Sequence, residues 1–550
     1  MRKYGIYLAY PHTVDLRAEG LGRQLAGFLK GTRHRSDVRF VIACPSWMRE
    51  NLRKLFEESG LSPEDFEIIA PAKKPLLLTA HEKLLAFRKG KVRRENETGL
   101  RARLRKFKLK LTQRIERQVA QTRSFWTMLF LGIAISPLIA LAIALRLLRR
   151  IVVSASHSTR KMRAGRNKGD APQGSGKPIS RMADKPSSFP IAVRLYNAME
   201  EAEAALLKEL INARKDICGW FSPTAFWPHF NNIETPRLMC VPDVVLMDFP
   251  VGFAPVGGDR FLENFKKVES AIYGGHYFVT YSEDVKWRTL VQRYNVEPEK
   301  VWVVHHGTNR MDDLINVSGF ADNAAATHAL CVNLFRTALL KAVNYGDARI
   351  FGSGNVRFMF YASQFRPNKN LLSLLRAYDY LLKRRHISHK LVLTGNPNGL
   401  PEIKRFIESR HLQNDVLCLH GLSAQELAAC YRLADLAVNP SLSEGGCPFT
   451  FTEAMSVGTP VTMARIPVTE EVISDRHLQD TMLFDPYDWI DMAERIEWCL
   501  NNLDALYARQ LPFYRQLAER TWLEVVNEHI EILETITLAE GEPECTRARA

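Results

Sequence analysis

The segment 439–449, NPSLSEGGCPF, brings an acidic residue, two adjacent glycines and a proline together before a predicted helix. Gly445 and Gly446 let the backbone approach a ligand closely, and the proline that follows suits the first helical position. Free N–H groups and the positive end of the helix dipole would hold an anion there. Glu444 precedes the turn, while Glu453 lies early in the helix, where a carboxylate can accept from both hydroxyls of a ribose. The pattern predicts a phosphate-binding turn; an ordinary capped helix after a strand is the alternative.

A second polar cluster, QFRPNKN at 364–370, follows a predicted strand at 358–363. Ligands of open α/β sheets bind at the carboxyl ends of the strands. Arg366 or Lys369 could therefore neutralise a diphosphate and stabilise the charge that develops as it leaves. Taken alone, each is an ordinary surface charge; the position after this strand favours phosphate binding.

Both clusters lie in a regular series of strands and helices that begins near residue 357. Apolar runs predict strands at 358–363, 390–395, 416–421, 435–440 and 460–464. Helices are predicted near 370–385, 401–410, 424–433 and 449–457. This alternation indicates a parallel sheet with right-handed crossovers.

A similar series occupies the N-terminal part of the chain. Strands are predicted at 4–10, 38–44, 65–69, 238–246, 277–281 and 301–304, with helices from Gly20 to residue 29 and at 46–58. We therefore predict an α/β protein with two Rossmann-like, doubly wound domains facing a cleft, which is the default ligand site. The predicted boundaries are 1–79 and 191–310 for the first domain, 80–190 for an insertion, 311–356 for a less regular interdomain connection, 357–505 for the second domain, and 506–550 for a C-terminal helix and tail.

The insertion combines an apolar run with strong basic flanks. Residues 125–145 carry no charge and could span about 30 Å of hydrocarbon, although Pro137 equally suits a re-entrant hairpin. Residues 80–122 read as a basic helix with one apolar stripe, either an interfacial helix on anionic lipid or a solvated charged helix, and 154–190 read as a linker. We expect contact with an anionic membrane through residues 80–165, monotopic or re-entrant, rather than a buried core helix.

Charge and cysteine usage narrow the functional class. The chain of 550 residues has a net charge of +15, and 81–190 alone hold 26 Lys and Arg against 6 Asp and Glu. Because the positive charge is confined to the flanks of the apolar run, we expect a membrane partner and no nucleic acid. The nine cysteines are scattered without metal-ligand spacing, so we expect no metal site and a reducing compartment.

The segments FYASQFRPNKN, LVLTGNP, SLSEGG and FTEAMSVGTPV, in this order within 357–473, resemble the donor-binding domain of glycosyltransferase family 4, whose members have the GT-B fold. The resemblance extends to VEPEKVWVVHHGTN at 296–309 and to Gly20-Leu21-Gly22, which is similar to the family's acceptor-side glycine loop. Trp522 and its helix resemble the C-terminal helix that packs back on the first domain. Residues 73–215 are not covered.

The resemblance implies transfer of a sugar from a nucleotide-sugar donor with retention of the anomeric configuration, without a further cofactor. It assigns Glu444 to sugar hydroxyls, Glu453 to the ribose and Lys369 to phosphate. The candidate catalytic residues are Glu444, Arg366, Lys369 and Asp243. The candidate donor-binding residues are Gly445, Gly446, Glu453, Gln364, Gly395 and Asn396, and the acceptor-side loop is Gly20, Leu21 and Gly22.

Three positions depart from the family pattern. Eight residues separate the two glutamates, where seven are usual. The usual Gly-Arg before the lysine is replaced by Ser363-Gln364, which leaves Arg366 as a displaced candidate for the missing charge. The first-domain His-Asp is replaced by Pro242-Asp243.

Together these observations predict a membrane-attached retaining glycosyltransferase at the cytoplasmic face of the inner membrane, acting on a lipid-linked or polysaccharide acceptor. The alternative is a catalytically silent GT-B subunit that scaffolds a membrane assembly. The nucleotide, sugar and linkage depend on single hydroxyl contacts and are left open.

Overall fold

The computed structural model describes residues 1–14, 16, 20–75, 78, 191–257, 259–343, 351 and 356–541. One compact unit comprises 1–70 and 208–550 and a second comprises 71–207. The predictions of an apolar segment at 125–145, a linker at 154–190 and a membrane contact through 80–165 lie outside the described residues. Within the described ranges, no helix has the length and apolar character needed to cross a bilayer.

The first sheet has seven parallel strands in the order β3-β2-β1-β4-β5-β6-β7. The strands are β1 (Arg2–Tyr7), β2 (Val38–Ala43), β3 (Glu67–Ile69), β4 (Trp220–Ser222), β5 (Arg237–Cys240), β6 (Tyr277–Thr280) and β7 (Val301–Val303). Strand β4 pairs with β1, with Gly5 opposite Trp220, so strands from both sides of 80–190 form one sheet. A side chain at Gly5 would collide with the Trp220 ring, which lies 2.1 Å from the position of an added Cβ, and this explains the glycine inside a strand.

The first sheet is accompanied by helices α1 (Gly20–Thr32), α2 (Arg49–Glu58), α7 (Val245–Asp248), α8 (Pro250–Gly257) and α9 (Asp259–Gly274), and by a π-helix at Val285–Arg293. Helix α6 spans Ile191–Asn212. The predicted strand at 238–246 is wrong in its second half, because β5 ends at Cys240 and α7 begins at Val245. Pro242 explains the early end, since proline has no N–H group to donate to the neighbouring strand.

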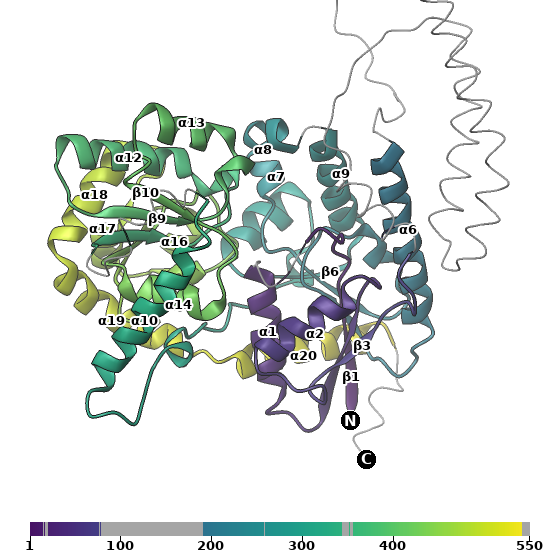
Figure 1. Ribbon diagram of the computed structural model, residues 1–550. Coiled ribbons are helices and arrows are strands. Elements are labelled where there is room, and N and C mark those ends of the chain that lie inside the picture. Colours follow the sequence, from purple (N-terminus) through teal and green to yellow (C-terminus); the bar gives the residue numbers. More distant parts are fainter. Residues whose placement is uncertain are drawn as a thin grey trace, which may run out of the picture. The chain divides into compact units, whose positions relative to one another are not determined.

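The second sheet has six parallel strands in the order β10-β9-β8-β11-β12-β13. The strands are β8 (Phe358–Tyr361), β9 (Lys390–Thr394), β10 (Val416–Leu419), β11 (Leu436–Asn439), β12 (Val461–Ala464) and β13 (Leu483–Phe484). The helices between and after them are α12 (Leu371–Arg384), α13 (Pro401–Ser409), α14 (Ala424–Leu433), α15 (Phe449–Ser456), α16 (Pro467–Val472), α17 (Arg476–Met482), α18 (Trp489–Asn501) and α19 (Leu503–Glu519) (Figure 1). The five predicted strands and four predicted helices of this domain are confirmed, and β13 is an additional short strand.

Residues 311–356 contain a helix where we expected irregular structure. Helix α10 spans Asn323–Leu339, and its N-cap Asp322 accepts a hydrogen bond from the N–H of Ala325 at 2.9 Å. Its residues Cys331 and Phe335 lie in the core that surrounds the second sheet. The expectation of an irregular connection is therefore wrong for this stretch, because Thr327, Cys331, Phe335 and Leu339 recur every four residues and form a buried stripe.

The C-terminal helix α20 (Trp522–Ala539) lies beside α1 (Figure 1). Thr521 caps α20 and shares reciprocal hydrogen bonds with Glu524, a capping box. Two glycines of α1 permit the close approach: a Cβ at Gly27 would lie 2.4 Å from the Trp522 indole, and one at Gly31 would lie 2.5 Å from the Trp522 carbonyl oxygen. Helix α20 thus packs on α1.

Candidate active site

Lys369 and Glu444 meet at the carboxyl edge of the second sheet. Lys369 ends a short 3₁₀ turn after β8, and Asn370 follows in the left-handed conformation with φ of 51°. The Lys369 ammonium donates to Oε1 of Glu444 at 2.7 Å and to Oγ of Ser441 at 3.2 Å. Burial alone would lower the pKa of Lys369, but Glu444, with smaller contributions from Tyr361 and Asp243, raises the pKa above its ordinary value. Two predicted site residues from separate clusters are therefore in direct contact.

Glu453 is a buried carboxylate at the other end of the same turn. It lies on α15 and is 1% exposed. Its Oε1 lies 3.2 Å from Nε of Arg23, on α1, and 3.5 Å from the amide nitrogen of Asn309. Burial raises the pKa of Glu453, and Arg23 and Asn309 counteract part of this effect. The Glu453 carboxylate is thus buried beside groups that can donate hydrogen bonds to it, and it does not face solvent.

The glycine pair between the glutamates packs against the first domain. A Cβ at Gly445 would lie 2.0 Å from the Pro242 carbonyl oxygen, and one at Gly446 would lie 2.9 Å from Nε2 of His306. The Ser282 hydroxyl also donates to the Gly445 carbonyl at 3.0 Å. The sequence predicts that a ligand approaches the backbone closely at these glycines. In the structure, the groups that approach closely belong to the first domain of the protein.

Helix α15 begins at Phe449, as predicted, but the expectation that Pro448 takes the first helical position is wrong. Pro448 is its N-cap, with φ of −60° and ψ of 124°, and the N–H of Phe451 already bonds to the Pro448 carbonyl. Pro448 is therefore the cap residue and not the first helical residue, because its extended ψ angle lies outside the helical region.

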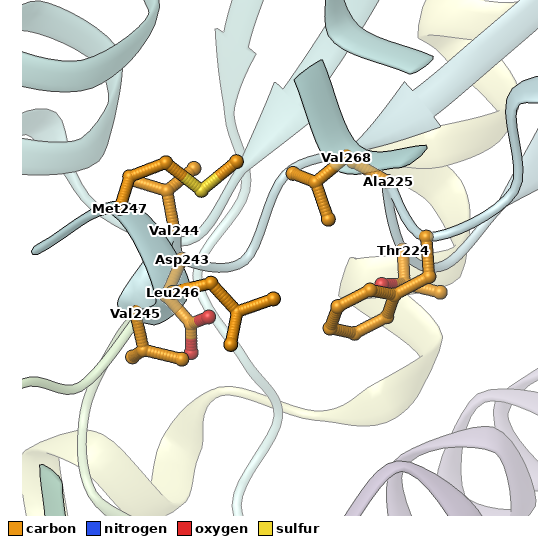
Figure 2. Close-up of a pocket in the computed structure, with 9 residues that line it drawn as sticks. Thr224, Ala225, Asp243, Val244, Val245, Leu246, Met247 and Val268 are labelled. Atoms are coloured by element: carbon orange, nitrogen blue, oxygen red, sulfur yellow. The ribbon is translucent and has the colours of Figure 1, made fainter. Parts of the chain in front are cut away.

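Asp243 shares the electrostatic environment of Lys369 and Glu444. Burial raises the pKa of Asp243, the charge of Lys369 counteracts this rise and that of Glu444 adds to it. Figure 2 shows Asp243 with Val245 and Leu246 on one side of a small pocket, opposite Val268. Lys369 and Glu444 are thus in direct contact, and their charges, together with that of Arg366, act on Asp243.

The remaining candidates of the second domain have more peripheral positions. Gln364 and Arg366 are exposed, whereas Lys369 is half-buried. The charge of Arg366 nevertheless acts on Asp243. Gly395 has φ of 133°, which favours glycine, and a Cβ there would lie 2.4 Å from the Phe365 ring. The Asn396 side chain accepts a hydrogen bond from the N–H of Asn398 at 3.0 Å and so caps the following turn. These contacts give Gly395 and Asn396 a structural task after β9.

The predicted acceptor-side loop forms the start of α1. Gly20 is exposed, with no atom within 4 Å of an added Cβ, and Leu21 is half-buried. At Gly22 a Cβ would lie 1.9 Å from the Leu16 carbonyl oxygen. Gly22, and not Gly20, is therefore required by the local backbone.

Several residues at the site were not predicted from the sequence. Arg23 and Gln24 directly follow the glycine loop, and the Gln24 amide donates to the Tyr281 hydroxyl. The Tyr281 and His306 rings have centroids 4.0 Å apart, and the His306 ring lies 5.0 Å from Phe449 at the start of α15. Burial lowers the pKa of His306 to about 3, so the ring is neutral at physiological pH. The sequence signal that could have identified these residues is their position: Arg23 and Gln24 follow the glycine loop, and His306 lies in the segment His305-His306-Gly307.

No group of three or more His, Cys, Asp or Glu side chains that could hold a metal ion is found in the part of the chain that the structure describes.

Residues 349–510 match the model of a protein family described as glycosyl transferases group 1. The chain is 35% identical over 131 residues to an MMP alpha-(1->4)-mannosyltransferase of Mycolicibacterium hassiacum, covering 23% of this chain and 31% of that protein. It is 28% identical over 243 residues to a D-inositol 3-phosphate glycosyltransferase of Thermobispora bispora, covering 43% and 50%. The matches therefore span half or less of these curated relatives.

A solved glycosyltransferase from Rickettsia africae is similar over almost the whole length. It aligns with 98% of this chain and 99% of its own, with a TM-score of 0.50 and 13% sequence identity. At this identity the likeness concerns the fold alone. Together with the two parallel sheets, it supports a GT-B fold.

Proposed function

We propose that this protein is a retaining glycosyltransferase of family 4 that moves a sugar from a nucleotide-sugar donor to an acceptor. The observation that carries the proposal is the pair of carboxylates, Glu444 and Glu453, that flank a glycine turn at the carboxyl edge of the second sheet. This edge lies within the segment that matches the glycosyl transferase family model. Ligands of open α/β sheets bind at such edges.

The charges at this edge suit a nucleotide diphosphate. Lys369 is cationic, and the N-terminus of α15 adds the positive end of a helix dipole. Positive groups in these places would stabilise the diphosphate as it leaves, without a metal ion. Glu453 would accept the ribose hydroxyls and Glu444 the sugar hydroxyls.

Retention would arise if the acceptor attacks on the face from which the diphosphate departs. Because no enzymic nucleophile is assigned, the departing phosphate oxygen would take the proton of the acceptor hydroxyl. Asp243, on the first-domain side, is the candidate to orient that hydroxyl, because it shares the electrostatic environment of Lys369 and Glu444. NMR analysis of the anomeric proton of the first-formed product would test the stereochemistry, and an inverted product would contradict it.

The activity itself is tested by incubating the full chain with labelled nucleotide-sugars and a lipid acceptor. Wild type should transfer label, and Glu453→Ala should lose both transfer and nucleotide binding. Glu402→Ala, which removes an exposed carboxylate on α13, is the matched control and should behave as wild type. Absence of transfer, together with unchanged nucleotide binding in Glu453→Ala, would contradict the proposal.

We further propose that the protein acts at the cytoplasmic face of the inner membrane, on a lipid-linked or polysaccharide acceptor. The support is the uncharged run 125–145 between basic flanks, which would adhere to anionic lipid through residues 80–165. Because β1 pairs with β4, the chain on both sides of the insertion must share one compartment. Cysteine labelling near residues 120 and 155 should therefore report the same face, and labelling from opposite faces would contradict the arrangement.

A catalytically silent subunit that scaffolds a glycan-assembly complex is the second candidate. It is favoured by Pro242, which stands where the family has a histidine and offers no titratable side chain beside the turn. Turnover by the purified protein alone would exclude this candidate.

A further inference from the structure

The two carboxylates that flank the glycine turn are each paired with a cation. Glu444 is paired with Lys369 of the second domain, and Glu453 is paired with Arg23 of the first. The Lys369 and Glu444 side chains are 20% and 19% exposed, while Arg23 is 33% exposed over a Glu453 that is almost completely buried. Four charges thus balance one another around the turn.

The Arg23 guanidinium is only partly engaged by this pairing. Its Nε lies 3.2 Å from Glu453 but is buried without a hydrogen-bond partner, so the contact is an ion pair of poor geometry. A guanidinium carries five N–H donors and matches phosphate oxygens better than one carboxylate oxygen at an unfavourable angle. Arg23 is therefore placed to exchange this partner for a better one.

The second domain lacks one of the charges that the family resemblance implies. The position before the lysine turn is Gln364, which is uncharged. Lys369 alone, with one positive charge, cannot balance a diphosphate that carries about two negative charges. A second cation would complete the balance. Arg366, the candidate from the second domain, is exposed, whereas Arg23 of the first domain is half-buried and pairs with Glu453.

We propose that Arg23 is a donor-binding residue that leaves Glu453 and pairs with the diphosphate of the bound nucleotide-sugar. This inference rests on the proposed function. In this exchange, Lys369 leaves Glu444 and Arg23 leaves Glu453, and both cations pair with the phosphate groups of the donor. Glu444 and Glu453 are then free to accept hydrogen bonds from the neutral hydroxyls of the sugar and the ribose. The ribose hydroxyls supply the donors that Glu453 loses when Arg23 turns to the phosphate, so Glu453 is not left as a buried carboxylate without donors.

The exchange would also link donor binding to the contact between the domains. The Arg23–Glu453 ion pair connects α1 to α15, and donor binding would replace it by a bridge from α1 through the diphosphate to the second domain. Arg23 would thereby add affinity only for ligands that carry a diphosphate. A nucleoside, which would contact Glu453 but has no phosphate, would gain no affinity from Arg23.

Calorimetric titration of the full-length protein with UDP, GDP and ADP, and with their nucleosides, tests this role. For the diphosphate that wild type binds, Arg23→Ala should weaken affinity by about 10- to 100-fold, the loss of a hydrogen-bonded charge pair. Nucleoside affinity should stay unchanged or increase, because Glu453 is released. Arg23→Lys should recover part of the diphosphate affinity, since the charge remains but the planar fork is lost.

Arg33→Ala is the matched control. Arg33 follows the same helix and pairs with Asp65 at the surface, so its removal should leave nucleotide affinity unchanged. The inference is overturned if Arg23→Ala changes diphosphate and nucleoside affinity by the same factor, or strengthens diphosphate binding. Arg23 would then serve only to hold the two domains together through its ion pair with Glu453. Failure of wild type to bind any of the three diphosphates would instead overturn the proposed function, together with this inference.

Discussion

The ammonium group of Lys369 lies 2.7 Å from Oε1 of Glu444, although the two residues come from different turns after different strands. Strands β8 and β11 are neighbours in the parallel sheet, so the turns that follow them leave the sheet at the same edge. The Asn368 carbonyl accepts hydrogen bonds from the Leu442 N–H at 2.8 Å and from the Ser441 hydroxyl at 3.4 Å, which fixes one turn against the other. The ion pair is thus a consequence of strand order.

The separate roles of these two residues can be distinguished by substitution. Lys369→Ala should weaken nucleotide diphosphate binding by about 10- to 100-fold, because a charge-assisted contact to phosphate is lost. Glu444→Gln should retain nucleotide affinity and lower kcat by about 100-fold or more, since its contact is expected at the sugar. Titration and steady-state kinetics provide the two readouts. Lys383→Ala, which removes a surface pair with Asp379 on α12, is the control and should change neither.

Gly445 should not tolerate a side chain. A Cβ would lie 2.0 Å from the Pro242 carbonyl oxygen, a backbone atom that cannot move without the loop that carries Asp243. We expect Gly445→Ala to cost about 1–3 kcal/mol of stability and to lower transfer activity, because the turn and this loop are pushed apart. Gly399→Ala, where an added Cβ meets nothing within 4 Å, should stay within about 0.5 kcal/mol of wild type. Equal urea midpoints for the two variants would show that the junction opens freely.

Much of the fold could be predicted because its strands are buried on both faces. Segments such as 358–363 and 416–421 are continuous apolar runs, which in a parallel sheet need no alternating pattern. Several predicted strands, such as 358–363 and 416–421, extend two residues beyond the observed ends, since the last residues already belong to the turns. The strand predicted at 238–246 is too long because apolar residues continue past Pro242 into a short helix.

The candidate site was predictable only where sequence order determines spatial order. Lys369 and Glu444 each follow a strand of the same sheet, and their shared edge follows from that pattern. The contact of Arg23 with Glu453 depends instead on how two domains pack and on the reach of a long side chain. Neither quantity is encoded in local periodicity, so the nearest sequence signal was the glycine loop before Arg23.

Acid should destabilise the protein through His529. This residue is 2% exposed between Phe28 and Phe221, and burial lowers its pKa from 6.5 to about 4. The neutral ring is favoured in the folded state, so its contribution is complete above pH 6.5 and is lost as the pH falls towards 4. A shift of this size corresponds to about 3 kcal/mol. Urea unfolding at several pH values should give a flatter profile for His529→Gln than for wild type, whereas His420→Gln, at an exposed position, should keep the wild-type slope.

Trp522 should hold the C-terminal helix against the first domain. An added Cβ at Gly27 or Gly307 would lie 2.4 Å or 2.8 Å from its indole, so two glycines from separate segments make room for one ring. Trp522→Ala would leave a cavity that two glycines cannot fill, and we expect a loss of about 2–4 kcal/mol in the free energy of unfolding. Trp287→Ala, at a tryptophan that is 46% exposed, should change stability by about 0.5 kcal/mol or less. Because Gly307 lies two residues before Asn309, which contacts Glu453, the loss of Trp522 should also weaken nucleotide binding, and a stable variant with full affinity would contradict this coupling.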